Sequence, residues 1–152
     1  KEIPTTASKT RMNILGAINL DDMSVVAKEY ESNINGASVV DFCNEIKENY
    51  ADKQVIHLIL DQAGYNKAAE VREHAFQLGI HLHYLPPYSP NLNAIERLWK
   101  VMNEETRNNV FFKTAKEFKS RVRKFIKHEL PEILPNLRSR ITDNFHIKKT
   151  AN

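Results

Sequence analysis

Two carboxylates in this sequence stand where a phosphoryl-transfer reaction would need them. Asp61 directly follows the apolar run VIHLIL (55–60), and Glu96 lies in the first turn of a predicted helix within YLPPYSPNLNAIERLW (84–99). Carboxylates brought together repel one another, and a divalent cation with oxygen ligands removes that repulsion. Bound cations of this kind activate a nucleophile and stabilise a leaving oxygen in phosphodiester displacement. The pair therefore predicts a Mg²⁺ or Mn²⁺ site, provided that the fold brings the two side chains together.

Each carboxylate also has a structural interpretation. Asp61 could open a turn, because DQAGYN (61–66) is rich in turn-forming residues. Glu96 lies three residues after Asn93, so the two could form a capping box in which the carboxylate accepts from a backbone N–H. Neither residue alone decides between structure and function. The pair favours function only if the end of the strand and the start of the helix are neighbours.

The loop before Glu96 is unusually stiff. Pro86, Pro87 and Pro90 restrict their own backbone angles and the conformations of the residues that precede them. Such a loop would fix the start of the helix relative to the sheet. We therefore expect its rigidity to place Glu96 against Asp61.

The first part of the chain predicts a hairpin followed by a helix. The runs at 11–20 and 23–30 are typical of two antiparallel strands, and Asp21 and Asp22 stand between them as turn residues. From 36 to 50 the apolar positions recur at close to helical spacing.

The middle of the chain predicts a βαβ unit. A strand at 55–60, a helix at 67–78 closed by Gly79, and a strand at 80–85 follow one another, which makes the two strands parallel. The almost continuous apolar run at 55–60 is typical of a strand buried on both faces. Ligands in open α/β sheets gather at the carboxyl ends of such strands, where Asp61 lies.

Helices dominate the rest. The pattern predicts a helix at about 92–107, with Trp99 in its apolar stripe as a core residue, and another at about 114–129 that Pro131 closes. Residues 132–152 are weakly patterned. The fold class is α/β: a mixed sheet of an antiparallel hairpin and parallel strands, flanked by helices.

Composition is that of a single globular domain over residues 1–152. The chain is 41% hydrophobic and 27% charged, which excludes a disordered chain, and it has no apolar run of the roughly 18 residues that a membrane span needs. A single cysteine, Cys43, excludes an internal disulfide framework and fits a reducing compartment.

Charge points weakly to nucleic acid. The formal net charge is +3, and from about residue 111 the chain becomes helical and basic. The basic segment, residues 113–127, contains seven basic residues and one acidic residue, Glu117. The basic residues are Lys113, Lys116, Lys119, Arg121, Arg123, Lys124 and Lys127. The segment is either a solvated helix face or a surface for DNA phosphate.

Several residues are candidates for contact with DNA. Tyr88 could stack on a base or sugar, and Arg97 and Lys100 flank Glu96 and could reach phosphate. The full set of candidates is Tyr88, Asn93, Arg97, Lys100, Arg121 and Lys124. His81 and His83 alternate along one strand, but without a cysteine or third histidine nearby they do not favour a zinc site.

Two segments carry a family resemblance. LILDQAGYNKAAEV (58–71) and LHYLPPYSPNLNAIERLWKVMN (82–103) resemble the catalytic domain of DDE-type transposases, in particular the bacterial insertion-sequence transposases related to the Tc/mariner superfamily. In that family a strand ends in the second catalytic Asp, and an LPPYSPxLNPIE segment delivers the catalytic Glu. Residues 62–95, 34 in number, separate Asp61 from Glu96, which matches the family's usual spacing. By resemblance these are the second and third catalytic carboxylates.

The resemblance implies an RNase H-like fold and Mg²⁺-dependent chemistry. Members hydrolyse DNA at transposon ends and then use the exposed 3′-OH to attack target DNA. The implied partner is double-stranded DNA, a homodimer is compatible with it, and the implied location is the bacterial cytoplasm, with the nucleoid.

This sequence departs from the family pattern in three ways. The first catalytic Asp lies on a strand before the hairpin, and this chain begins after that strand, so it is expected to be a fragment without the first strand and inactive when isolated. Asn66 stands where many members carry His, and Ala94 replaces the usual Pro. Two alternatives stay open: a non-catalytic DNA-binding remnant that uses the basic segment, and a module that merely oligomerises.

Overall fold

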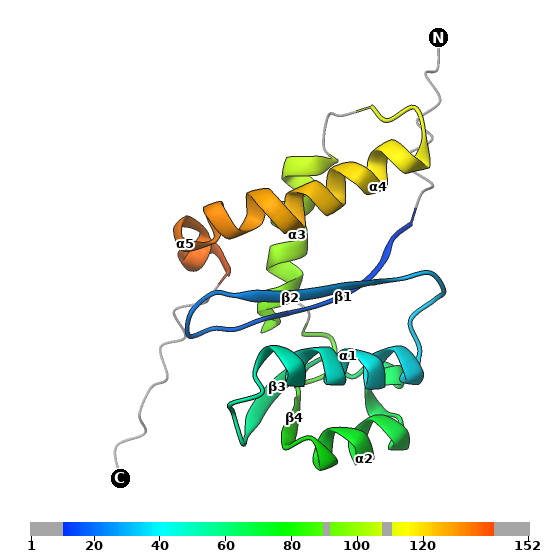
Figure 1. The fold of residues 1–152 in the computed structure, drawn as a ribbon, viewed down its shortest axis with the longest axis vertical. Helices are drawn as coiled ribbons and strands as arrows, with labels where there is room; N and C mark the ends of the chain where they lie inside the picture. Colours follow the sequence, from blue (N-terminus) through cyan, green and yellow to red (C-terminus); the bar gives the residue numbers. More distant parts are fainter. Residues whose placement is uncertain (1–10, 90–91, 108–110, 142–152) are drawn as a thin grey trace.

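The computed structural model describes residues 11–89, 92–107 and 111–141 as two small sheets with helices around them (Figure 1). In chain order the elements are β1 (Asn13–Ile18), β2 (Val25–Tyr30), α1 (Gly36–Asn49), β3 (Ile56–Leu60), η2 (Gly64–Lys67), α2 (Ala69–Gln77), β4 (Ile80–Tyr84), α3 (Ala94–Thr106), α4 (Ala115–Lys124), η4 (Phe125–Glu129) and α5 (Leu130–Ile141). The α/β architecture predicted from the sequence is confirmed. None of the helices described is both long enough and apolar enough to cross a bilayer.

The hairpin forms as predicted. β1 and β2 pair antiparallel, from Asn13 opposite Tyr30 to Ile18 opposite Val25. Asp22 stabilises the turn, because its Oδ1 accepts hydrogen bonds from the backbone N–H and the hydroxyl of Ser24, at 2.9 and 2.7 Å. The interpretation of Asp21 and Asp22 as turn residues is therefore confirmed.

The βαβ unit also forms. β3 and β4 pair in parallel, from Ile56 opposite Ile80 to Leu60 opposite Tyr84. Gly79 follows α2 with a φ of 73°, and a Cβ at this position would strike the carbonyl oxygen of Gln54. Glycine is required here on both counts.

The prediction that β3 is buried on both faces is wrong. Leu60 is buried and Leu58 half-buried, whereas His57 and Ile59 on the opposite face are exposed, Ile59 by 48%. α1 and α2 cover only one face of this sheet, through a cluster that includes Val39, Cys43, Val71 and Ala75. An apolar run cannot show which of its two faces the neighbouring helices will cover.

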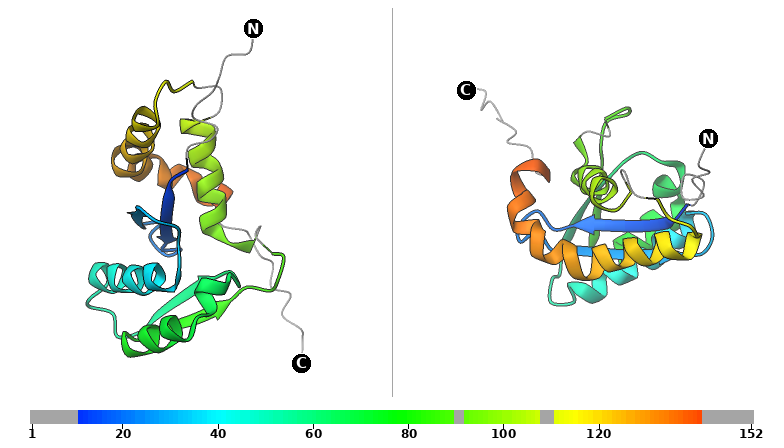
Figure 2. Two further views of the ribbon diagram at one scale, coloured as in Figure 1. Left: turned by 90° about the vertical axis from the view of Figure 1, so that its right-hand side faces the viewer. Right: turned by 90° about the horizontal axis from the view of Figure 1, so that it is seen from above.

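The hairpin and the parallel strands do not join into the single mixed sheet expected from the resemblance. Among the residues described, β1 pairs with β2 and β3 with β4, and no ladder links the two sheets. α1 lies between them (Figures 1 and 2). Phe42 and Ile46 of α1 pack towards the hairpin residue Val26, while Val39 and Cys43 pack towards α2.

A cleft of about 390 Å³ separates β1 from β3. Residues 16–18 of β1 and 56–59 of β3 line its two sides. Ile46 of α1, Tyr50 directly after α1 and residues 92–95 at the start of α3 also contribute to its lining. The strand edges that carry no partner thus lie on either side of one groove.

α3 packs on the hairpin through Trp99 and on α5 through Leu98 and Val101. Leu98 is fully buried, but Trp99 is only half-buried, so its assignment to the core is corrected. The Trp99 ring lies directly over Gly16 of β1: a Cβ built there would be 2.5 Å from Cζ2 and 2.8 Å from Cη2. This glycine makes room for the indole.

The prediction that Pro131 closes the fourth helix is wrong. α4 passes through the π-helical turn η4 into α5, which reaches Ile141. Pro131 falls in the first turn of α5, directly after the wider π-turn, where a missing N–H disturbs the hydrogen-bond ladder least. The weak pattern predicted for this part of the chain does not hold for α5, whose buried residues recur at helical spacing. These residues are Leu130, Leu134, Leu137 and Ile141. Residues 142–152 lie outside the described part.

The contact between Gly16 and Trp99 predicts a specific loss of stability. Gly16→Ala places a methyl group inside the space of the indole, and such overpacking costs about 1–3 kcal/mol. Gly64→Ala is the matched control, because a Cβ there meets nothing within 4 Å. Urea unfolding of both variants measures the difference, and equal stabilities would contradict this packing.

Candidate active site

Asp61 follows β3 directly and is held in one orientation. Its Oδ1 accepts from the backbone N–H of Ala63 at 2.9 Å and from the side-chain amide of Asn66 at 2.9 Å. The backbone of Asn66 is itself held in place, because its main-chain carbonyl accepts a hydrogen bond from the Tyr84 hydroxyl at 2.7 Å. The turn predicted at Asp61 is therefore present, and Asn66, which departs from the family pattern, orients the carboxylate.

Glu96 occupies the third position of α3. Asn93 caps this helix: its side chain accepts from the N–H of Ile95 at 3.3 Å, and its carbonyl accepts from the N–H of Glu96 at 3.1 Å. Within the described residues, no hydrogen bond runs from the backbone N–H of Asn93 to the Glu96 carboxylate, so the capping box is not formed. The Glu96 carboxylate therefore does not cap the start of its own helix.

The two carboxylates interact electrostatically. Partial burial raises the pKa of Glu96, and the negative charge of Asp61 raises it further. The pKa of Tyr65 is also raised, first by burial and then by the charges of Asp61 and Glu96. The charge of Asp61 thus acts on both Glu96 and Tyr65.

The loop that leads to α3 is tied to β3 at its start. The N–H of Leu85 donates to the carbonyl of Leu60 at 2.9 Å, and the side-chain amide of Gln62 donates to the carbonyl of Leu85 at 2.9 Å. Tyr88 then adopts a φ of 58°, and its side chain is 101% exposed. A bulky residue with positive φ is a strained conformation that the surrounding chain must hold.

Three of the candidate DNA-binding residues have structural roles. Asn93 is 8% exposed and caps α3. Arg97 donates to the carbonyl of Ile141 at 3.5 Å, and Arg121 donates to the Glu129 carboxylate at 3.0 Å. These contacts account for the three residues without DNA.

The other three candidates lie at the surface. Tyr88, Lys100 and Lys124 are all exposed. Within the basic segment, Arg123 forms an ion pair with Glu29 at 2.8 Å, so part of the positive charge is neutralised inside the molecule. The surface that remains for phosphate is smaller than the sequence indicates.

The sequence reasoning missed a third histidine. His57 lies beside His83, with Nδ1 and Nε2 2.8 Å apart, and its ring centroid is 5.3 Å from that of His81. The signal was the parallel register, which places position 57 opposite position 81. Even so, no group of three or more His, Cys, Asp or Glu residues in the described ranges is arranged to hold a metal ion.

Comparisons with known proteins agree with the resemblance. The family described as DDE superfamily endonuclease matches residues 1–119. An uncharacterized protein, y4pE/y4sA, of Sinorhizobium fredii (strain NBRC 101917 / NGR234) is 36% identical over 69 residues. That match covers 45% of this chain and 49% of the relative, so the chain spans about half of that protein's length.

The electrostatic interaction of the two acids predicts a change in one pKa. Asp61→Asn keeps the Oδ1 acceptor of the turn but removes the charge, so the pKa of Glu96 should fall and yet stay above its ordinary value, because burial is the larger cause. NMR titration of the Glu96 carboxyl carbon measures it. Asp52→Asn, at an exposed site, is the control and should leave this pKa unchanged; an unchanged value in Asp61→Asn would show that the acids do not interact.

The same raised pKa predicts a dependence of stability on pH. The folded protein keeps the Glu96 proton to a higher pH than the unfolded chain, so ionisation of Glu96 opposes folding as the pH rises through this interval. Glu96→Gln should therefore be more stable than the wild type at about pH 7 and equal to it at about pH 3. Thermal unfolding at both pH values tests this, and a gain confined to the acidic sample would contradict it.

Proposed function

We propose, from the premise that this chain belongs to the DDE superfamily of endonucleases, that residues 1–152 form the catalytic domain of a DNA transposase. The domain would hydrolyse phosphodiester bonds at transposon ends and transfer the resulting 3′-OH into target DNA. The observation that carries the proposal is the placement of the two acids: Asp61 stands directly after the parallel strand β3, and Glu96 stands in the first turn of α3, where the charge of Asp61 helps to raise its pKa.

The residues present suit a hard divalent cation. Asp61 and Glu96 offer carboxylate oxygens, the preferred donors for Mg²⁺ and Mn²⁺, and their mutual repulsion is what a bound cation relieves. When bound, Mg²⁺ would supply the charge that activates the attacking oxygen and stabilises the leaving one. The chain's own contribution is orientation: Asn66 fixes the Asp61 carboxylate, and Asn93 fixes the start of the helix that carries Glu96.

A third carboxylate would come from a strand outside the described residues. The groove between β1 and β3 has a strand on each side, and its lining includes residues 92–95 next to Glu96. A strand inserted there in parallel with β3 would end beside Asp61, because parallel strands end at the same edge of a sheet. This insertion would also turn the two small sheets into the one mixed sheet that the resemblance implies.

The main alternative is a remnant that binds DNA without cutting it. The exposed Lys116 and Lys124 beside Phe112 favour this alternative, since they leave a basic surface on α4. Binding through these lysines would need no metal and would weaken steeply with salt. A module that only oligomerises would show neither cleavage nor this salt dependence.

The decisive measurement is nicking of supercoiled DNA by the native protein. Nicking should require Mg²⁺ or Mn²⁺. Glu96→Gln should reduce the nicking rate by more than about 100-fold, which is the upper end of the loss seen when a residue that only hydrogen-bonds a metal ligand is removed. Glu105→Gln is the matched control, because it removes an exposed carboxylate from the same helix and should leave nicking intact.

Two results would overturn the proposal. Nicking by Glu96→Gln at the wild-type rate would exclude the carboxylate from the chemistry. Metal-independent DNA binding without any nicking by the wild type would instead assign the chain to the DNA-binding alternative.

A further inference from the structure

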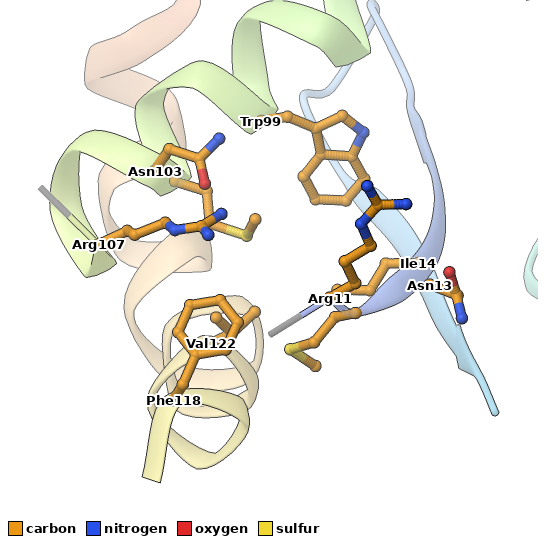
Figure 3. A pocket seen from close by; sticks show the side chains of 10 residues that line it. Arg11, Asn13, Ile14, Trp99, Asn103, Arg107, Phe118 and Val122 are labelled. Carbon is orange, nitrogen blue, oxygen red and sulfur yellow. The ribbon is translucent and has the colours of Figure 1, made fainter. Parts of the chain in front are cut away.

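A second cleft lies between the start of β1 and the helices α3 and α4 (Figure 3). Its volume is about 370 Å³, within the size range of small-molecule sites. Ten residues line it: Arg11, Met12, Asn13, Ile14, Trp99, Met102, Asn103, Arg107, Phe118 and Val122. The carboxylate site does not use this cleft, since neither Asp61 nor Glu96 lines it.

The charge of the cleft favours an anion. Arg11 and Arg107 enter it from different elements, the first ahead of β1 and the second at the end of α3, and Figure 3 shows both side chains extending into the space. No carboxylate is among those lining residues that the structure describes. Arg107 lies over the Phe118 ring at 5.4 Å, a cation–π contact that holds the guanidinium in the cleft. Guanidinium groups bind phosphate in a bidentate manner, so phosphate is the anion that suits this pair.

The rest of the lining suits a nucleobase. Trp99 offers a half-buried indole whose position is set by its contact with Gly16, while the buried Phe118 ring supports the Arg107 guanidinium beside it. Asn13 and Asn103 add amides that can both donate and accept hydrogen bonds, as the edge of a base requires. Bases unpaired from a duplex are commonly held by this combination of stacking, amide contacts and basic groups on the phosphate. A bare phosphate would leave the Trp99 indole without a stacking partner.

The position of the cleft relates it to the carboxylates. Asn103 follows Glu96 by seven residues on α3, and at about 1.5 Å per residue that is roughly 10 Å along the helix axis. A strand with stacked bases advances about 3.4 Å per nucleotide, so the distance corresponds to about three nucleotides. One DNA strand following α3 could therefore reach both places.

We propose that this cleft binds one unpaired nucleotide of a DNA strand, with its phosphate between Arg11 and Arg107 and its base against Trp99. The identity of the nucleic acid as DNA rests on the proposed function. The binding itself does not, because it needs neither Asp61 nor Glu96 nor a metal ion.

Trp99 makes the test direct, because it is the single tryptophan of the chain. The oligonucleotide d(T)6, added in EDTA, should quench the Trp99 fluorescence saturably. Arg107→Gln and Arg11→Gln should each weaken binding by about tenfold, the effect of losing a charge-assisted hydrogen bond. Arg72→Gln is the matched control: it removes an exposed arginine from α2 and should change the affinity less than twofold. Arg107→Lys should bind weakly as well, since it keeps the charge but loses the planar fork.

The remaining arms separate the proposal from its rivals. A hexamer lacking the base at every position should bind more weakly than d(T)6, and inorganic phosphate should fail to displace d(T)6 at equal concentration. Equal affinity of the abasic hexamer, full displacement by phosphate, or unchanged binding by both arginine variants would overturn it. Saturable quenching by d(T)6 in EDTA should be found even if nicking is never found, so failure of the catalytic proposal would be seen separately.

Discussion

The arrangement of the molecule depends on the burial of α1 between two sheets that, in the part of the chain the structure describes, no strand pairing joins. Its Phe42 and Ile46 pack on the hairpin side, and its Val39 and Cys43 pack on α2 and the parallel strands. Each fully buried side chain of this kind contributes about 1.5–3 kcal/mol. Because α1 is apolar on both sides, it connects the two sheets through side-chain packing. It thereby fixes the position of β3, and of Asp61 at its end, relative to the hairpin.

The second connection is α3, whose two ends serve different purposes. Trp99 fixes the helix on Gly16 of β1, while Asn93 and the loop tied to Leu60 fix its start near β3. Glu96 is therefore held by a helix anchored on the hairpin, and Asp61 by a turn anchored on the parallel unit. The repulsion between the two acids opposes this arrangement, so the packing of α1 and α3 must supply the energy that keeps them together. Groups held together against their own electrostatics are typical of functional sites.

The sequence predicts those features that depend on local chemistry. The hairpin turn at Asp22, the βαβ unit, and Gly79 after α2 all follow from short-range signals, and all are present. The failures are features that tertiary packing decides. The apolar run of β3 could not show that Ile59 would stay exposed, and Pro131 could not show that a π-turn would precede it. Glu96 lacks the capping-box bond although its spacing from Asn93 allows it, since the side chain of Asn93 alone caps the helix.

The groove between the two sheets bears on how the chain would bind DNA under the proposed function. The groove between β1 and β3 and the cleft beside Trp99 both border β1. Gly16 lines the groove, and it also packs against the Trp99 indole that lines the cleft. A strand that enters the groove would pair with the edge of β1. Because Trp99 packs directly against Gly16, any shift of β1 on pairing would also move the indole. α3 carries that shift to Glu96, three residues away from the indole. Under the proposed function, completion of the sheet, seating of a nucleotide and placement of the Glu96 carboxylate would then be coupled through one rigid helix, without any need for a longer pathway through the molecule.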